Sequence, residues 1–224
     1  MLTIRSYLFA MVSPLSQPNS RLPRWLLASI AGAAVCAIPL AALLAQPRAQ
    51  ASFTVEETGR GYGSLQAAVD AIGNREGTVV IAPGNWNECA VQREGVVHFR
   101  AAQAGKALLG GKACEGKAAL VLRGRGASVD GLVFADISVA DGNGAGIRLE
   151  EGPLKVSQSW FRDSQQGILT TNGVESELVI DKSTFTRLGT CENSAGCAHS
   201  IYVGDYGSLK VTRTRFEQGV GGHY

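Results

Sequence analysis

Side chains able to bind or transform a ligand gather in one short segment near the end of the chain. These side chains are His199, Tyr202, Asp205 and Tyr206. Histidine and tyrosine can serve as general acids or bases, and aromatic rings stack against the apolar faces of sugars. Arg148, further back in the chain, is of a residue type that holds carboxylates in bidentate pairs. We therefore predict His199 and Tyr202 as candidate catalytic residues, and Arg148, Asp205 and Tyr206 as substrate-binding residues.

The elements that would position these residues repeat along the chain. Four seven-residue stretches align, each ending in Phe with Val or Ile five residues earlier. The stretches are Ser128–Phe134, Lys155–Phe161, Val179–Phe185 and Lys210–Phe216. Their phenylalanines follow one another at intervals of 27, 24 and 31 residues. A second set of apolar stretches comprises Leu120–Leu122, Ile147–Leu149, Ile168–Thr170 and Ile201–Val203.

This periodicity predicts an all-β fold, a right-handed parallel β-helix. A repeat of this length marks one supersecondary unit stacked along an axis, and here the unit consists of short strands and glycine-rich turns. Side chains alternate between the two faces of a strand, so the Val or Ile and the Phe of one stretch both point inward only if the chain bends between them. The alternative, an antiparallel sandwich, would need two-residue hairpin turns, and the sequence contains few of them.

The same stacking assigns a face to the candidate ligand residues. If Ile201 and Val203 point into the core, Tyr202 points outward, in line with Leu169 and Arg148 of the preceding coils. We expect this outward face to bind the ligand. The alternative is a ladder of side chains across the coils that only stabilises the stack.

The first 51 residues have the composition of an export leader. They contain four arginines and no acidic residue, an apolar run from Trp25 to Ala45, and then Ala49–Ala51, the small-x-small pattern of a signal-peptidase site. The run is also long enough to span a bilayer, so a cleaved signal peptide and a retained inner-membrane anchor both remain open. Either one places the β-helix domain, residues 52–224, in the periplasm or outside the cell. The overall net charge of +2 belongs to the leader, so the domain has no basic surplus to attract nucleic acid.

The C-terminal residues Gly221–Tyr224 begin the pattern of another coil, and no polar terminal unit follows. Solenoids protect their last edge with such a unit. We therefore expect the β-helix to be incomplete at its C-terminus, or its edge to pair with another molecule. The oligomeric state is left open.

Four cysteines follow the leader, an even number that favours disulfides in an exported protein. Cys89 and Cys114 are 25 residues apart, about one coil, and neighbouring coils bring such residues within bonding reach. Cys191 and Cys197 lie in the widest interval between repeats and would close the base of a loop. We predict the disulfides Cys89–Cys114 and Cys191–Cys197. A metal site formed by Cys191, Cys197 and His199 is the alternative, but it lacks an obvious fourth ligand, so we expect no metal and no cofactor.

A short helix should cover the open end of the first coil. Ser64 can cap a helix whose apolar stripe comprises Leu65, Ala68, Val69 and Ile72. The segment Gly77–Gly84 follows as a buried strand closed by a Pro-Gly turn. Together, Gly63–Ile72 and Thr78–Glu88 resemble the start of pectin lyase-like right-handed parallel β-helix proteins. That group includes pectate lyases, pectinesterases and polygalacturonases, with bacterial periplasmic copper-maturation proteins and alginate epimerases nearby. The resemblance extends over residues 53–224.

The resemblance implies a protein that binds a polysaccharide and cleaves or epimerises it, as a lyase, glycoside hydrolase or epimerase. The calcium-binding aspartates of pectate lyases and the catalytic aspartates of the other enzymes have no counterpart at matching positions. The roles expected for His199 and Tyr202 therefore depend on their place in the stack, and Arg148 favours acidic sugars. The alternative is a non-catalytic cell-envelope scaffold or adhesin-like solenoid, because this fold serves many functions.

Overall fold

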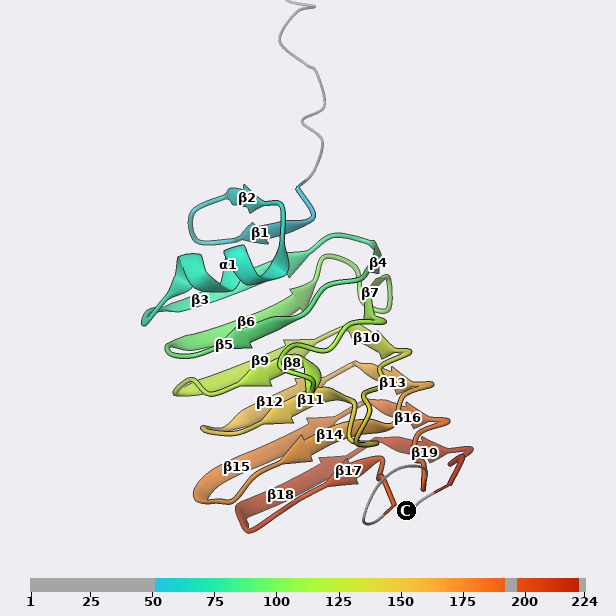
Figure 1. The fold of residues 1–224 in the computed structure, drawn as a ribbon. Coiled ribbons are helices and arrows are strands. Elements are labelled where there is room, and N and C mark those ends of the chain that lie inside the picture. The colour runs from blue at the N-terminus through green and yellow to red at the C-terminus, as the bar shows by residue number, and fades with distance from the viewer. Residues whose placement is uncertain (1–50, 192–196, 222–224) are drawn as a thin grey trace, which may run out of the picture. The chain divides into compact units, whose positions relative to one another are not determined.

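The computed structural model describes residues 51–191 and 197–221. These residues form a parallel β-solenoid of about five turns, in which each turn adds a strand to each of three sheets (Figure 1). Sheet A comprises β1 (Phe53–Val55), β2 (Arg60–Tyr62), β3 (Glu76–Ile81), β6 (Val96–Ala101), β9 (Gly126–Asp130), β12 (Leu154–Ser157), β15 (Gly173–Asp181) and β18 (Tyr206–Thr212). Sheet B comprises β4 (Gly84–Trp86), β7 (Ala107–Gly110), β10 (Leu132–Ala135), β13 (Trp160–Arg162), β16 (Thr184–Thr186) and β19 (Arg215–Glu217). Sheet C comprises β5 (Ala90–Gln92), β8 (Ala118–Leu122), β11 (Ala145–Leu149), β14 (Gln166–Thr170) and β17 (Ile201–Tyr202).

The strand register confirms the repeats and the predicted parallel β-helix. The Val/Ile column in sheet A comprises Val129, Val156, Ile180 and Val211. The Phe column in sheet B comprises Phe134, Phe161, Phe185 and Phe216. The inward column of sheet C comprises Leu120, Ile147, Ile168 and Ile201. Pairing between turns is parallel throughout, which excludes the antiparallel sandwich for the described residues.

The bend that lets Val and Phe of one repeat both point inward lies between sheets A and B. One residue there adopts a left-handed backbone in each coil, with φ between 49° and 71°: Gly131, Gln158, Lys182 and Arg213. A buried column of hydroxyls follows the bend. Ser159 and Ser183 donate to the carbonyl two residues earlier, and the Ser183 hydroxyl also accepts the backbone N–H of Ser159. These hydroxyls provide hydrogen-bond partners for backbone groups at the corner, where the regular pairing of the β-sheets is interrupted.

The phenylalanine rings form a continuous stack inside the solenoid. Consecutive centroids are 4.7–5.1 Å apart and the rings are within 12° of parallel. The stack requires a residue without a side chain on the facing strand of sheet C. A Cβ atom at Gly167 would lie 2.7 Å from Cδ1 of Phe185, and one at Gly146 would lie 2.7 Å from Cδ1 of Phe161. These glycines therefore make room for the rings.

The predicted helix closes the first coil. Helix α1 (Leu65–Ile72) is capped by the Ser64 side chain, which accepts the backbone N–H of Ala67, and its apolar stripe is buried in the core. β1 and β2 form an antiparallel hairpin that the repeat pattern did not predict, and β1 pairs antiparallel with β3. Gln66 of α1 both donates to and accepts from the backbone of Val91, so the helix also protects the edge of sheet C.

At the other end of the described residues, the inward side chains are exposed. Leu209, Val211 and Phe216 of the last coil are all partly open to solvent. No helix among the described residues is long and apolar enough to span a membrane. Residues 1–50 of the predicted leader lie outside the described residues, as do the loop interior 192–196 and the terminal residues 222–224.

Candidate functional site

The outward face of sheet C carries three of the side chains on which the predicted site was based. Arg148, Leu169 and Tyr202 occupy one column on three consecutive coils. Tyr202 points outward as predicted and is 45% exposed, while Leu169 is buried. Coils stack at about 4.8 Å, so the column places a cation, an apolar patch and an aromatic ring in line over two coil spacings.

The structure brings one predicted pair into contact. The rings of His199 and Tyr202 meet edge to face, with centroids 5.4 Å apart. Both rings can transfer protons, so together they could provide an acid and a base at the exposed end of the column. Asp205 lies at the corner between sheets C and A, where its backbone N–H binds the side chain of Asn172. Its own side chain is exposed.

Tyr206 occupies a different environment. It begins β18 in sheet A, and its half-buried ring packs against the core. Its hydroxyl donates a hydrogen bond of 2.6 Å to the carbonyl of Gly152, and burial raises the pKa of this hydroxyl. Tyr206 therefore links two coils through this hydrogen bond, and the ligand site on sheet C does not include it.

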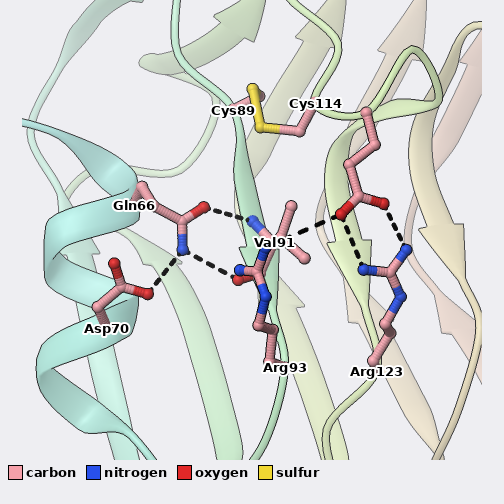
Figure 2. Close-up of a disulfide and its surroundings, with 8 residues drawn as sticks. Gln66, Asp70, Cys89, Val91, Arg93, Cys114 and Arg123 are labelled. Atoms are coloured by element: carbon pink, nitrogen blue, oxygen red, sulfur yellow. Dashed lines mark hydrogen bonds and ion pairs between the residues drawn. A yellow bond between two sulfur atoms is a disulfide. The ribbon is translucent and has the colours of Figure 1, made fainter.

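The Cys89–Cys114 disulfide anchors a second group of residues on the same face (Figure 2). Cys89 precedes β5 and Cys114 precedes β8, so the bond links two neighbouring coils at the corner between sheets B and C, as predicted. The segment after Cys114 forms a tight turn, in which the Cys114 and Ala118 backbones bond to each other. The turn projects Glu115 and Lys117 over the end of sheet C.

Around this turn lies a charged cluster of six side chains. Its members are Arg93, Glu115, Lys117, Arg123, Arg148 and Glu150. Arg123 is central, because its guanidinium donates to both carboxylates. Lys117 donates to Glu150 at 2.7 Å. Four cations share two carboxylates, so the cluster keeps a positive surplus on this face.

Hydrogen bonding in the cluster lowers the pKa of both carboxyl groups. The hydrogen bonds from Arg123 are the main reason that the pKa of Glu115 falls to about 2. Burial raises the pKa of Glu150, but hydrogen bonds from Arg123 and Lys117 outweigh burial and lower it from the ordinary value of 4.5. Both carboxylates therefore stay charged at neutral pH.

These shifts predict a loss of stability in acid. A carboxyl group whose pKa is lower in the folded state binds more protons when unfolded, so its contribution is complete above its unfolded pKa of about 4.5 and is lost as the pH falls toward 2. The free energy of unfolding, measured in urea, should therefore decrease between about pH 5 and pH 3. Glu150→Gln should weaken this pH dependence. Part of the dependence should persist in the variant, because the pKa values of Asp163 and Asp181 are also lowered to about 2. An identical pH dependence in the variant would contradict this role.

Arg148 connects the charged cluster to the aromatic end of the face. Its side chain is 24% exposed, and its Nε lies 3.6 Å from Glu150 Oε1, an ion pair without a hydrogen bond. The Nε is buried and has no hydrogen-bond partner among the described residues. Buried donors normally have a partner, so the Arg148 guanidinium retains an unused N–H donor.

The second predicted disulfide is also present. Cys191 and Cys197 are bonded at the base of the loop, with Cα atoms 4.2 Å apart. Because the two sulfur atoms are bonded to each other, they are not thiolate ligands for a metal shared with His199. No group of three or more His, Cys, Asp or Glu side chains within 51–191 and 197–221 is arranged to hold a metal ion.

Sequence reasoning identified Arg148 but missed its charged neighbours. A signal was present: Arg123 directly follows Leu122, and Glu150 directly follows Leu149, so both occupy one position of the repeat. Glu115 and Lys117 had no such signal, because they lie in a turn between strands whose course depends on the disulfide. Comparison with family models, with curated proteins and with solved structures finds no match for this chain.

Proposed function

We propose that this protein acts outside the cytoplasm and binds an acidic polysaccharide along the outward face of sheet C. Two disulfides in one small domain are typical of oxidising compartments. The resemblance of the first coil to pectin lyase-like proteins suggests the class of ligand. The observation that carries the proposal is Arg148, whose mostly buried side chain lies in line with an exposed tyrosine and whose Nε has no hydrogen-bond partner in the described part of the chain.

Arg148 and Tyr202 each suit one part of a uronate chain. The guanidinium of Arg148 can hold a carboxylate through two parallel hydrogen bonds. The exposed ring of Tyr202 can stack on a sugar face, while Leu169 between them is buried. The positive surplus of the charged cluster attracts a polyanion and raises its rate of association.

The same geometry supports a catalytic role for His199 and Tyr202. Lyases and epimerases of acidic sugars remove a proton from the carbon beside the carboxylate, and a cation on that carboxylate makes the proton easier to remove. Arg148 would supply the cation and the ring pair the acid or base, which requires their side chains to converge across the two coil spacings between their strands. Whether a reaction follows binding is decided by the product assay below.

Replacing Arg148 by alanine is expected to weaken binding of uronate-containing polysaccharides by about tenfold or more, since one buried charge-assisted contact is lost. Arg148→Lys should restore the charge but only part of the affinity, because an ammonium lacks the paired donors. Tyr202→Ala should also weaken binding. Lys155→Ala, which removes an exposed cation from sheet A, is the matched control and should have no effect. Affinity electrophoresis of the exported full chain in gels that contain a uronan measures these changes.

The same uronans, incubated with the protein, should be examined for unsaturated or epimerised products. Binding without products would identify a binding module. Absence of binding, or equal binding by the wild type and Arg148→Ala, would reject the proposal and favour a scaffold or adhesin-like solenoid.

A further inference from the structure

The outward face of sheet B presents an apolar column that the site on sheet C does not use. Leu108, Val133 and Trp160 lie in register on three consecutive coils. Val133 is buried, but Trp160, the largest of the three, is 41% exposed. Because the Trp160 side chain is so exposed, it contributes much less hydrophobic free energy to folding than a buried tryptophan would.

Polar contacts hold the Trp160 ring in place. Its Nε1 donates a hydrogen bond of 3.3 Å to the hydroxyl of Thr186, one coil further on. The Arg162 guanidinium lies over the ring, 5.3 Å from its centroid. Asp163 accepts a hydrogen bond from Arg162 at 2.5 Å and fixes the guanidinium in turn. The exposed ring face is thus ordered before any ligand arrives, which lowers the entropic cost of binding.

A groove of about 340 Å³ begins beside Arg162, whose guanidinium lies over the Trp160 ring, and extends along the column to Leu108. Asn85, Asn87 and Asp136 add polar side chains to it, and Trp86 adds a second indole. The side chains of Asn85, Asn87 and Asp136 make no hydrogen bond or ion pair within the described residues. The groove therefore combines apolar surfaces with amide and carboxylate groups that are available to hydroxyls.

The charges around the groove favour a ligand without charge. Arg162 and Arg187 both donate to Asp163, and these hydrogen bonds hold the pKa of Asp163 near 2, so it stays ionised. In the lining of the groove itself, the charged side chains are Arg162 and Asp136, one cation and one carboxylate. A polyanion would gain little electrostatic attraction here. A neutral sugar, in contrast, would find oxygen acceptors for its hydroxyl groups, amide donors and an aromatic face together.

We infer that sheet B carries a second binding site, for a neutral glycan, in which Trp160 stacks on a sugar ring and Asn85, Asn87 and Asp136 bind hydroxyl groups. The site lies on another face than the acidic-polysaccharide site and does not depend on the function proposed for sheet C. The alternative is a structural role, in which Trp160 only covers Val133 from solvent and the groove binds no ligand. The two roles differ in what happens to glycan binding when groove residues change.

Affinity electrophoresis of the exported full chain in separate gels of a β-glucan, a mannan and a xylan tests the inference. We expect retardation in at least one gel. Trp160→Thr, which places the residue type of the next coil in this column, should raise the dissociation constant by about tenfold or more. Asn87→Ala, a change at an exposed position without a structural bond, should weaken binding while folding is unaffected.

Thr184→Ala is the matched control, because Thr184 lies in the column of Trp160 but one coil further from the groove, and this variant should bind as the wild type does. No retardation in any neutral gel, or unchanged binding by both Trp160→Thr and Asn87→Ala, overturns the inference. Gels that contain a uronan report on Arg148 and sheet C, so failure of either site is recognised separately.

Discussion

Replacing Phe185 by alanine is expected to lower the free energy of unfolding by about 3–5 kcal/mol. Its side chain is fully buried and is stacked between Phe161 and Phe216, with centroid distances of 4.7 and 5.1 Å. Removing the ring takes away contacts on both of its faces and leaves a cavity in the ladder. The facing residue is Gly167, which has no side chain to fill that cavity. Urea unfolding of the two proteins measures the difference.

Phe216→Ala is the matched control for this prediction. Phe216 belongs to the same column, but it is 49% exposed and has a ring neighbour on one side among the described residues. Its removal should cost clearly less than the removal of Phe185. Equal losses for the two variants would contradict a stabilising contribution from burial within the ladder.

Removing the Cys89–Cys114 disulfide by alanine at both positions is expected to lower the free energy of unfolding by about 2–4 kcal/mol. The bond closes a chain segment of 25 residues, so its loss enlarges the unfolded ensemble considerably. The Cys191–Cys197 bond spans a sequence separation of only 6, and its removal should cost less for the same reason. Denaturant unfolding of both double variants gives the comparison.

Peptide mapping of the oxidised protein by mass spectrometry checks the pairing itself. Each bond should be recovered within its predicted pair. A bond between Cys89 and Cys191 would contradict the coil register, because these residues belong to coils that the strand pairing places far apart along the solenoid.

The repeat pattern was sufficient to predict the coils, because residues at equivalent positions of neighbouring coils must stack about 4.8 Å apart. The aligned Val and Phe positions became the columns of sheets A and B, and the bend between them became the left-handed residues at that corner. The Cys89–Cys114 pairing followed from the same spacing, whereas the Cys191–Cys197 pairing followed from the loop that these residues bracket. The helix before the first coil had its own local signal in the Ser64 cap and its apolar stripe.

The candidate sites could be predicted only where they lie within one column. Arg148, Leu169 and Tyr202 share a column, and the sequence placed them correctly in relation to one another. Tyr206 lies past a corner, and its hydroxyl bond to Gly152 was not foreseeable from strand alternation. The hairpin of β1 and β2 has no repeat signal at all, because it precedes the first coil.

Contacts across columns depend on the corners, whose lengths and backbone conformations differ from coil to coil. Glu115 reaches Arg123 because a disulfide-bonded turn projects it over sheet C, and Arg162 covers Trp160 because Asp163 turns its guanidinium. Period and burial thus set which residues are stacked and which face they occupy. The packing of side chains between columns, which only the folded chain brings together, decides which of them are engaged and which remain open to a ligand.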